Sequence, residues 1–198
     1  MARSRLALLA VLLAVAAGLA GAGTAASGRA PLPGLMTGKG PWGPNDGDGL
    51  KQRLKAIGLD ALPREALALH IHQRMAILVN GKFVDVPAGI GIDANGKFIT
   101  ELHTHDNLGI IHVESPKQRP FTLGEFFDVW GLRLSSRCLG GYCTDGKKHV
   151  WVWTDGRRVR TDPRPIVLTD HLSIVVAYGT LKSIPMPVPK HFPFPKGY

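Results

Sequence analysis

Four short turn sequences between β-rich runs constrain this chain more than any other feature. Asn80-Gly81, Asn95-Gly96 and Asp155-Gly156 each interrupt a stretch that is rich in Val, Ile, Phe or Trp. Asn-Gly and Asp-Gly adopt positive φ at low cost, and they therefore favour the two-residue turns that join antiparallel strands. Residues 106–109 predict a fourth reversal of the chain. Repeated turns of this kind predict a predominantly antiparallel β-sheet.

Two segments depart from the strand pattern and predict short helices. Residues 50–57 carry leucine and isoleucine at helical spacing and are followed by a glycine. In residues 122–131, Thr122 is placed to cap a helix, Glu125 follows three positions later, and Gly131 can end it. We therefore predict an α+β domain, predominantly antiparallel β, of small β-grasp-like or β-sandwich type with one or two short helices.

The two ends of the chain differ in composition from the middle. Residues 1–26 have a basic head, an apolar run and small-residue cleavage sites, which is the layout of a secretory signal peptide. Residues 27–49, rich in Gly and Pro, predict a linker, and residues 184–198 predict a Pro-rich C-terminal arm. The single β-rich domain is expected over residues 50–183. The protein is thus expected to be secreted or extracytoplasmic, in the cell envelope, with a membrane attachment only if residues 1–26 are not cleaved.

Cysteine usage agrees with export. Cys138 and Cys143 are separated by four residues, two of which are glycines that let the chain double back. In an exported chain this spacing predicts a disulfide. A cysteine zinc site would need a second pair, which the sequence lacks.

The net charge of +9 raises the question of a nucleic-acid partner. The basic residues are scattered, with small clusters only at Lys147-Lys148 and around Arg157-Arg158, and no basic stripe is interleaved with aromatic residues. We therefore expect no nucleic-acid binding. The sequence does not identify a protein partner in the cell envelope.

The stretch "ELHTHDNLGIIHVES", residues 101–115, concentrates histidines and acids in two short strands. Side chains two positions apart on a strand share a face, so His103 and His105 point the same way. Folding the chain at residues 106–109 places His103 opposite His112 and Glu101 opposite Glu114. Opposed residues have Cβ atoms about 4.5–5.5 Å apart, so three imidazoles converge on one face.

Imidazoles at this spacing indicate a site for a divalent transition metal, whose bonds to nitrogen are about 2.0–2.1 Å long for zinc. A second same-face pair, His70 and His72, can reach the same point from a neighbouring strand. Carboxylates nearby can complete the coordination or orient the imidazole rings. The predicted ligands are His70, His72, His103, His105 and His112, and the additional or orienting carboxylates are Asp106, Glu114 and Glu101. Copper(II) or zinc suits this donor set, bound as one ion or two.

Enzyme motifs fit the chain poorly. The HTHDN sequence is similar to the HxHxDH motif of metallo-β-lactamase-like hydrolases, but its acid comes one residue early and the final histidine is missing. The HIHQ sequence at 70–73 resembles the first cupin motif, which implies His70 and His72 as ligands, but residues 74–77 lack the expected glutamate. We assign no catalytic residue. The leading hypothesis is copper or zinc handling or sensing, with a cupin-like or hydrolase-type metalloenzyme and a structural module with bracing histidines as alternatives.

Taken together, the histidine motifs, "GIIHVESP" and "FTLGEFFDVWG" resemble a group of exported or membrane-anchored bacterial proteins of uncharacterised function. The resemblance covers residues 69–131. It implies that the histidine-bearing strands are a shared feature of that group, and it carries no reaction to this chain.

Overall fold

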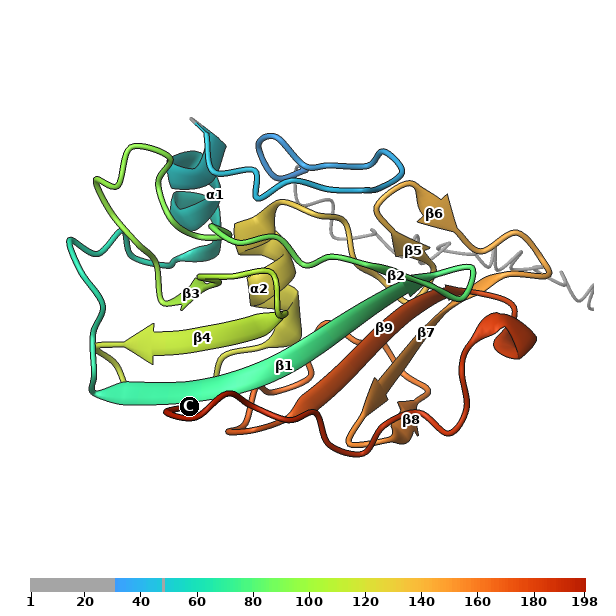
Figure 1. Ribbon diagram of the computed structural model, residues 1–198. Helices are drawn as coiled ribbons and strands as arrows, with labels where there is room; N and C mark the ends of the chain where they lie inside the picture. Colours follow the sequence, from blue (N-terminus) through green and yellow to red (C-terminus); the bar gives the residue numbers. More distant parts are fainter. Residues whose placement is uncertain (1–30, 48) are drawn as a thin grey trace, which may run out of the picture. The chain divides into compact units, whose positions relative to one another are not determined.

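One mixed β-sheet organises the described part of the chain, which comprises residues 31–47 and 49–198 of the computed structural model (Figure 1). The signal peptide expected at residues 1–26 lies outside these residues. Two short α-helices and mostly antiparallel strands confirm the predicted α+β class.

The element bounds are as follows. The helices are α1 (Gly49–Ile57) and α2 (Leu123–Trp130), and η1 (Leu181–Ser183) is a single 3-10 turn. The large sheet contains β1 (Leu69–Val79), β2 (Lys82–Val84), β3 (Leu102–His103), β4 (Ile110–Ser115), β7 (His149–Thr154), β8 (Arg157–Val159) and β9 (Ser173–Gly179). A second, two-stranded sheet is formed by β5 (Cys138–Leu139) and β6 (Tyr142–Cys143).

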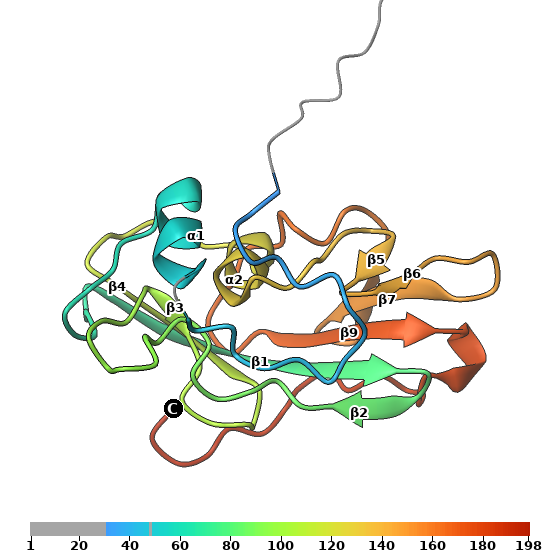
Figure 2. The ribbon, with the colours of Figure 1, turned by 90° about the horizontal axis from the view of Figure 1, so that it is seen from above.

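The strand order of the large sheet is β3-β4-β1-β9-β7-β8, and β2 pairs with the end of β1. The central strands β1 and β9 are parallel, whereas β4 and β7 flank them in antiparallel pairing. Helix α2 lies in the connection between the two halves and crosses one face of the sheet (Figure 2). This arrangement corresponds to the β-grasp alternative. The first and last strands, β1 and β9, are parallel neighbours at the centre of the sheet, and the long crossover that this pairing needs includes α2.

Turn chemistry fixes the hairpins as expected. Asn80-Gly81 joins β1 to β2, and Asp155-Gly156 joins β7 to β8, each as a two-residue loop with positive φ at both positions. Residues 106–109 reverse the chain between β3 and β4. Asn95-Gly96 also lies in a turn, but only an isolated bridge between Ile92 and Ile99 flanks it rather than a strand ladder.

Helix α2 forms the centre of the core. The Thr122 hydroxyl accepts a hydrogen bond from the Glu125 amide, the Glu125 carboxylate accepts one from the Thr122 amide, and Gly131 ends the helix at φ 69°. The helix buries Phe126, Phe127 and Trp130 completely against the sheet. These capping contacts are the ones that the sequence predicts.

The opposite face of the sheet is partly covered by the C-terminal segment. Ile184 and Val188 are buried against Trp153 and Val175 of the sheet. The chain then continues alongside β1 (Figure 1), and Tyr198 ends near His72, with a distance of 5.0 Å between ring centroids. The segment expected as a surface arm therefore contributes a second, smaller apolar cluster.

The Gly/Pro-rich segment 31–47, part of the expected linker, packs on the domain. Trp42 is buried, with its ring 6.4 Å from that of Trp130 in an edge-to-face arrangement. The completely buried guanidinium of Arg53 donates hydrogen bonds to the carbonyls of Pro33, Asn45 and Val129. One side chain thus ties this segment to the end of α2, which explains why a sequence without periodicity is held in place.

The predicted disulfide between Cys138 and Cys143 is confirmed. It links β5 to β6 across their tight turn. Both cysteines of the chain are therefore oxidised and cannot bind a metal ion as thiolates.

Gly109 at the end of the β3–β4 turn allows a close approach to β1. Its φ is +74°, and a Cβ atom added there would lie 2.1 Å from the carbonyl oxygen of Met75. Gly96 has a similar φ of +66°, but a Cβ atom added at Gly96 would have no neighbouring atom within 4 Å.

We therefore expect Gly109→Ala to lower the free energy of unfolding by about 2–5 kcal/mol, from backbone strain and overpacking together. The matched control Gly96→Ala should cost only the strain, about 1–2 kcal/mol. Urea denaturation of both variants measures the difference, and equal losses would show that the close approach is unimportant.

Candidate metal centre

The register of three strands brings the predicted histidines together. In the β3–β4 pair, His103 lies opposite His112, as the sequence predicts. On its other side β4 pairs with β1, so that His72 lies opposite His112 and His70 lies opposite Glu114. Strand alternation sends these side chains to the face away from α2, because Ile111 and Val113 occupy the helix-facing core.

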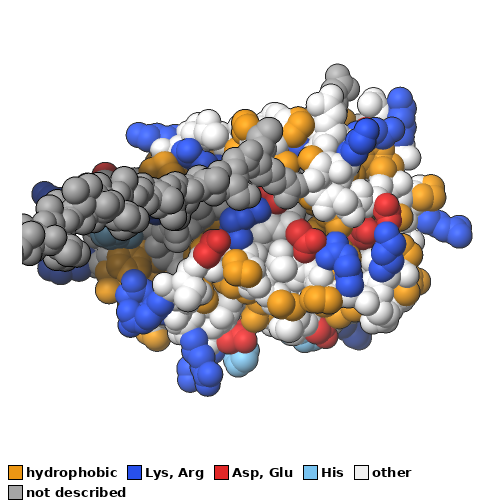
Figure 3. All heavy atoms as spheres, turned by 180° about the vertical axis from the view of Figure 1, so that it is seen from behind, with side chains coloured by type: hydrophobic (Ala, Val, Ile, Leu, Met, Phe, Trp, Pro, Cys, Tyr) orange, Lys and Arg blue, Asp and Glu red, His pale blue; other side chains and the backbone are white. Residues whose placement is uncertain are grey.

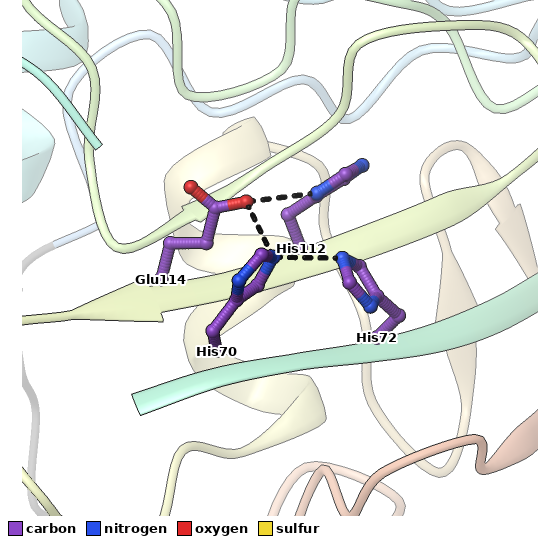
Figure 4. A group of neighbouring side chains, drawn as sticks. All are labelled: His70, His72, His112 and Glu114. Atoms are coloured by element: carbon purple, nitrogen blue, oxygen red, sulfur yellow. Dashed lines mark hydrogen bonds and ion pairs between the residues drawn. The ribbon is translucent and has the colours of Figure 1, made fainter. Parts of the chain in front are cut away.

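The first group of donors comes from β1 and β4 and is shown in Figure 4. The Nε2 atoms of His70 and His72 are 3.2 Å apart, and Oε1 of Glu114 lies 3.3 Å from Nε2 of His70. Nδ1 of His112 is 3.1 Å from the same carboxylate oxygen. Each residue offers one donor atom, and all four atoms lie within 4.8 Å of one another.

The second group shares His112 and Glu114 with the first but takes its other members from β3 and the turn after it. Nε2 of His103 is 3.1 Å from Nε2 of His105 and 3.9 Å from Oε1 of Glu114. Its four donor atoms also lie within 4.8 Å of one another. Donors bound tetrahedrally to one zinc ion at about 2.0–2.1 Å lie about 3.3–3.4 Å apart, so both groups are close to a coordinating geometry.

A backbone contact orients the most deeply buried histidine of the cluster. Nδ1 of His103 lies 2.9 Å from the carbonyl oxygen of Thr100. A carbonyl only accepts hydrogen bonds, so Nδ1 carries the proton in the neutral ring and Nε2 keeps its lone pair. Metal-ligating histidines typically have such a hydrogen bond at the far nitrogen, which holds the ring in place.

Burial keeps the two inner histidines neutral. Desolvation lowers the pKa of the completely buried His103 from 6.5 to about 3, against the effects of the Thr100 carbonyl and Glu114. Desolvation also lowers the pKa of His72 to about 4, and the neighbouring imidazoles add to the shift. Both rings are therefore unprotonated at pH 7, which is the state that binds a metal ion.

Glu114 carries the negative charge of the cluster. Burial raises the pKa of its carboxyl group, but the hydrogen bond from His112 and the fields of the surrounding histidines outweigh burial and lower the pKa. Its Oε1 atom faces the imidazoles, whereas Oε2 is buried and has no hydrogen-bond partner in the described residues. An ionised carboxylate oxygen in this position lacks a positive counterpart.

Two of the predicted carboxylates are used elsewhere. Glu101 is expected opposite Glu114 and close to the histidines. Its Oε2 instead accepts hydrogen bonds from the Asp60 amide and the Thr100 hydroxyl. Asp106 accepts one from the Leu108 amide and stabilises the β3–β4 turn. Neither residue belongs to the two donor groups.

Glu65 is a neighbour that the sequence analysis missed. Its carboxylate Oε1 lies 3.2 Å from Nε2 of His105. It comes from the irregular segment between α1 and β1, where no periodicity assigns a residue to either face of the sheet. Only the folded chain reveals this contact.

The centre has a buried interior and two exposed edges. His103 and Glu114 are buried to 0% and 3% side-chain exposure, whereas His70 and His105 are 43% and 38% exposed. The exposed members lie at opposite ends of the cluster, one on β1 and one after β3. An ion from solvent can therefore reach each group through an exposed imidazole.

Positive charge is not concentrated on the face shown in Figure 3. Lys and Arg side chains are dispersed there among acidic and apolar ones. Arg158, from one of the two basic clusters in the sequence, stacks on the ring of Trp151 at 4.2 Å from its centroid. Part of this basic cluster thus has a packing role.

Comparisons with known proteins give no match: neither a family model, nor a curated protein, nor a solved structure matches the chain. The resemblance of residues 69–131 to uncharacterised exported proteins stays a prediction. Within the described part of the chain, no helix combines the length and the apolar character needed to cross a bilayer.

We expect the metal-free protein to lose stability in acid. The folded-state pKa values of His72 and His103 lie below 6.5, so below that pH the unfolded chain binds protons that the folded chain excludes. Stability therefore falls as the pH drops from 6.5 toward these folded-state pKa values, and at pH 5 the loss is about 2 kcal/mol for the completely buried His103.

Thermal unfolding with a chelator at pH 7.5 and pH 5.0 measures this loss. The variant His103→Asn, which keeps a donor for the Thr100 carbonyl, should show a smaller decrease in Tm, whereas His171→Asn, at an exposed position, should behave like the wild type. Identical pH dependence in all three proteins would contradict the assignment.

Proposed function

We propose that this protein is an exported transition-metal-binding protein that handles or senses copper(II) or zinc. One observation carries the proposal: Oε1 of the buried Glu114 lies 3.1–3.9 Å from ring nitrogens of three histidines, while its Oε2 is buried with no partner among the described residues. A divalent cation would supply the missing positive charge. Without one, an unsatisfied buried acceptor costs about 1–3 kcal/mol.

The bracing alternative explains less of this arrangement. A hydrogen-bonded network that only cross-links strands is stabilising when each buried member has a partner. The His70–His72 and His103–His105 contacts are at hydrogen-bond distance, which bracing would also give, but Glu114 keeps a buried oxygen unpaired within the described chain. The donor set therefore supports metal coordination over structural cross-linking.

The ligand types favour certain ions. Imidazole with carboxylate suits Zn(II) and Cu(II), whereas Cu(I) prefers thiolate or thioether ligands. The cysteines are paired in a disulfide, and Met75 lies in the core on the other face of the sheet. The disulfide also agrees with an oxidising compartment, as the signal-like residues 1–26 predict.

A binding role accounts for the site better than catalysis. When it holds an ion by itself, either donor group provides three imidazoles and one carboxylate, which is the number that closes a tetrahedral site. A catalytic zinc ion has three protein ligands and keeps a fourth position for water or substrate. The metalloenzyme alternative would require one of these groups to lose a ligand.

We expect zinc or copper(II) to stabilise the metal-free, untagged protein. At a free ion concentration of 100 times Kd the gain is about 2.7 kcal/mol, or roughly 5–10 °C in Tm for a chain of this size. Calorimetric titration of the same sample provides the affinity. An unchanged Tm with both ions would support the bracing alternative.

Two isosteric variants separate the metal site from general stability. Glu114→Gln should weaken metal binding at least tenfold, because it removes the charged ligand. Glu101→Gln is the matched control, since Glu101 is equally buried in the same strand register but bonds to Asp60 and Thr100. Elemental analysis of a His103→Ala/His112→Ala variant completes the test: metal content equal to that of the wild type would refute the site.

A further inference from the structure

The six residues of the centre divide into two pairs of histidines around a shared middle. His70 and His72 form one pair, His103 and His105 form the other, and both donor groups include His112 and Glu114. We propose that the centre binds two metal ions, one at each histidine pair, bridged by the carboxylate of Glu114. This inference rests on the proposed metal-binding function and specifies how many ions that function involves.

Distances argue against a single ion for all five histidines. Two ligands of one zinc ion are separated by at most twice the bond length, about 4.2 Å. The donor atoms within each pair are 3.2 Å and 3.1 Å apart, which suits one ion. No group of the described residues unites both pairs within 4.8 Å, so one ion cannot bind to both pairs in this arrangement.

Glu114 is placed to serve both pairs. Its Oε1 atom is 3.3 Å from Nε2 of His70 and 3.9 Å from Nε2 of His103, one member of each pair. Its Oε2 atom is buried and has no partner in the described residues. A single carboxylate oxygen within reach of both pairs can bridge two ions, and two-metal sites hold their ions about 3.5–4 Å apart.

His112 lies between the pairs as well. Its ring is in edge-to-face contact with His72 on one side and with His105 on the other, at centroid distances of 4.7 Å and 4.5 Å. The two pairs are also alike in access to solvent, since each combines a buried ring with an exposed one. The cluster is therefore built as two similar halves.

Metal stoichiometry tests this inference directly. Untagged full-length protein is stripped with a chelator, loaded with excess Zn(II), freed of unbound ion by gel filtration, and analysed for zinc per chain. We expect two ions for the wild type and one ion each for His70→Ala/His72→Ala and His103→Ala/His105→Ala. The control variant His171→Asn/His191→Ala, altered at two exposed histidines outside the cluster, should retain two.

The possible zinc ratios distinguish failure of the two-ion inference from failure of the proposed metal-binding function. A wild-type ratio of one refutes the two-ion centre and leaves the metal-binding function intact, whereas a ratio of zero refutes both. Equal zinc content in the wild type and both cluster variants also refutes the inference. Because the variants could misfold, a second measurement uses the wild type alone. The electron paramagnetic resonance spectrum of the Cu(II)-loaded protein should show two interacting ions. A spectrum of isolated Cu(II) alone would overturn the proposal.

Discussion

The double pairing of β4 is the constraint on which the rest of the site depends. This strand is antiparallel to β1 on one side and to β3 on the other, and the register places His112 between His72 and His103. A slip of one residue would turn the histidines toward α2. Ile111 and Val113 prevent it, because both are completely buried on that side. Apolar burial on one face of the strand therefore fixes the polar row on the other.

Burying the histidines and the carboxylate of the cluster costs free energy, and this burial also sets their protonation states. Imidazoles and a carboxylate are desolvated here, and burial holds His72 and His103 in the neutral form that can donate a lone pair. The ionised Glu114 supplies the carboxylate that both donor groups share. A cation bound at this point would offset the desolvation of these groups, and folding and metal binding would then be coupled through the same side chains.

The remainder of the fold supports the site on several sides. Helix α2 fills the core beneath the strands, and the parallel pairing of β1 with β9 joins the histidine-bearing half of the sheet to β7 and β8. The C-terminal segment crosses the polar face and places Tyr198 against His72 and His112. Exposed His70 and His105 keep both ends of the cluster accessible to solvent.

The sequence alone determined what neighbouring residues control. The turns at Asn80-Gly81 and residues 106–109, the caps of α2, and the alignment of His103 with His112 follow from local φ preferences and strand alternation. Tertiary structure decided the rest: which strand lies beside β4, that Glu101 turns to Asp60, and that Glu65 reaches His105. These contacts join segments far apart in the chain, and they depend on how the whole core packs, which no local pattern encodes.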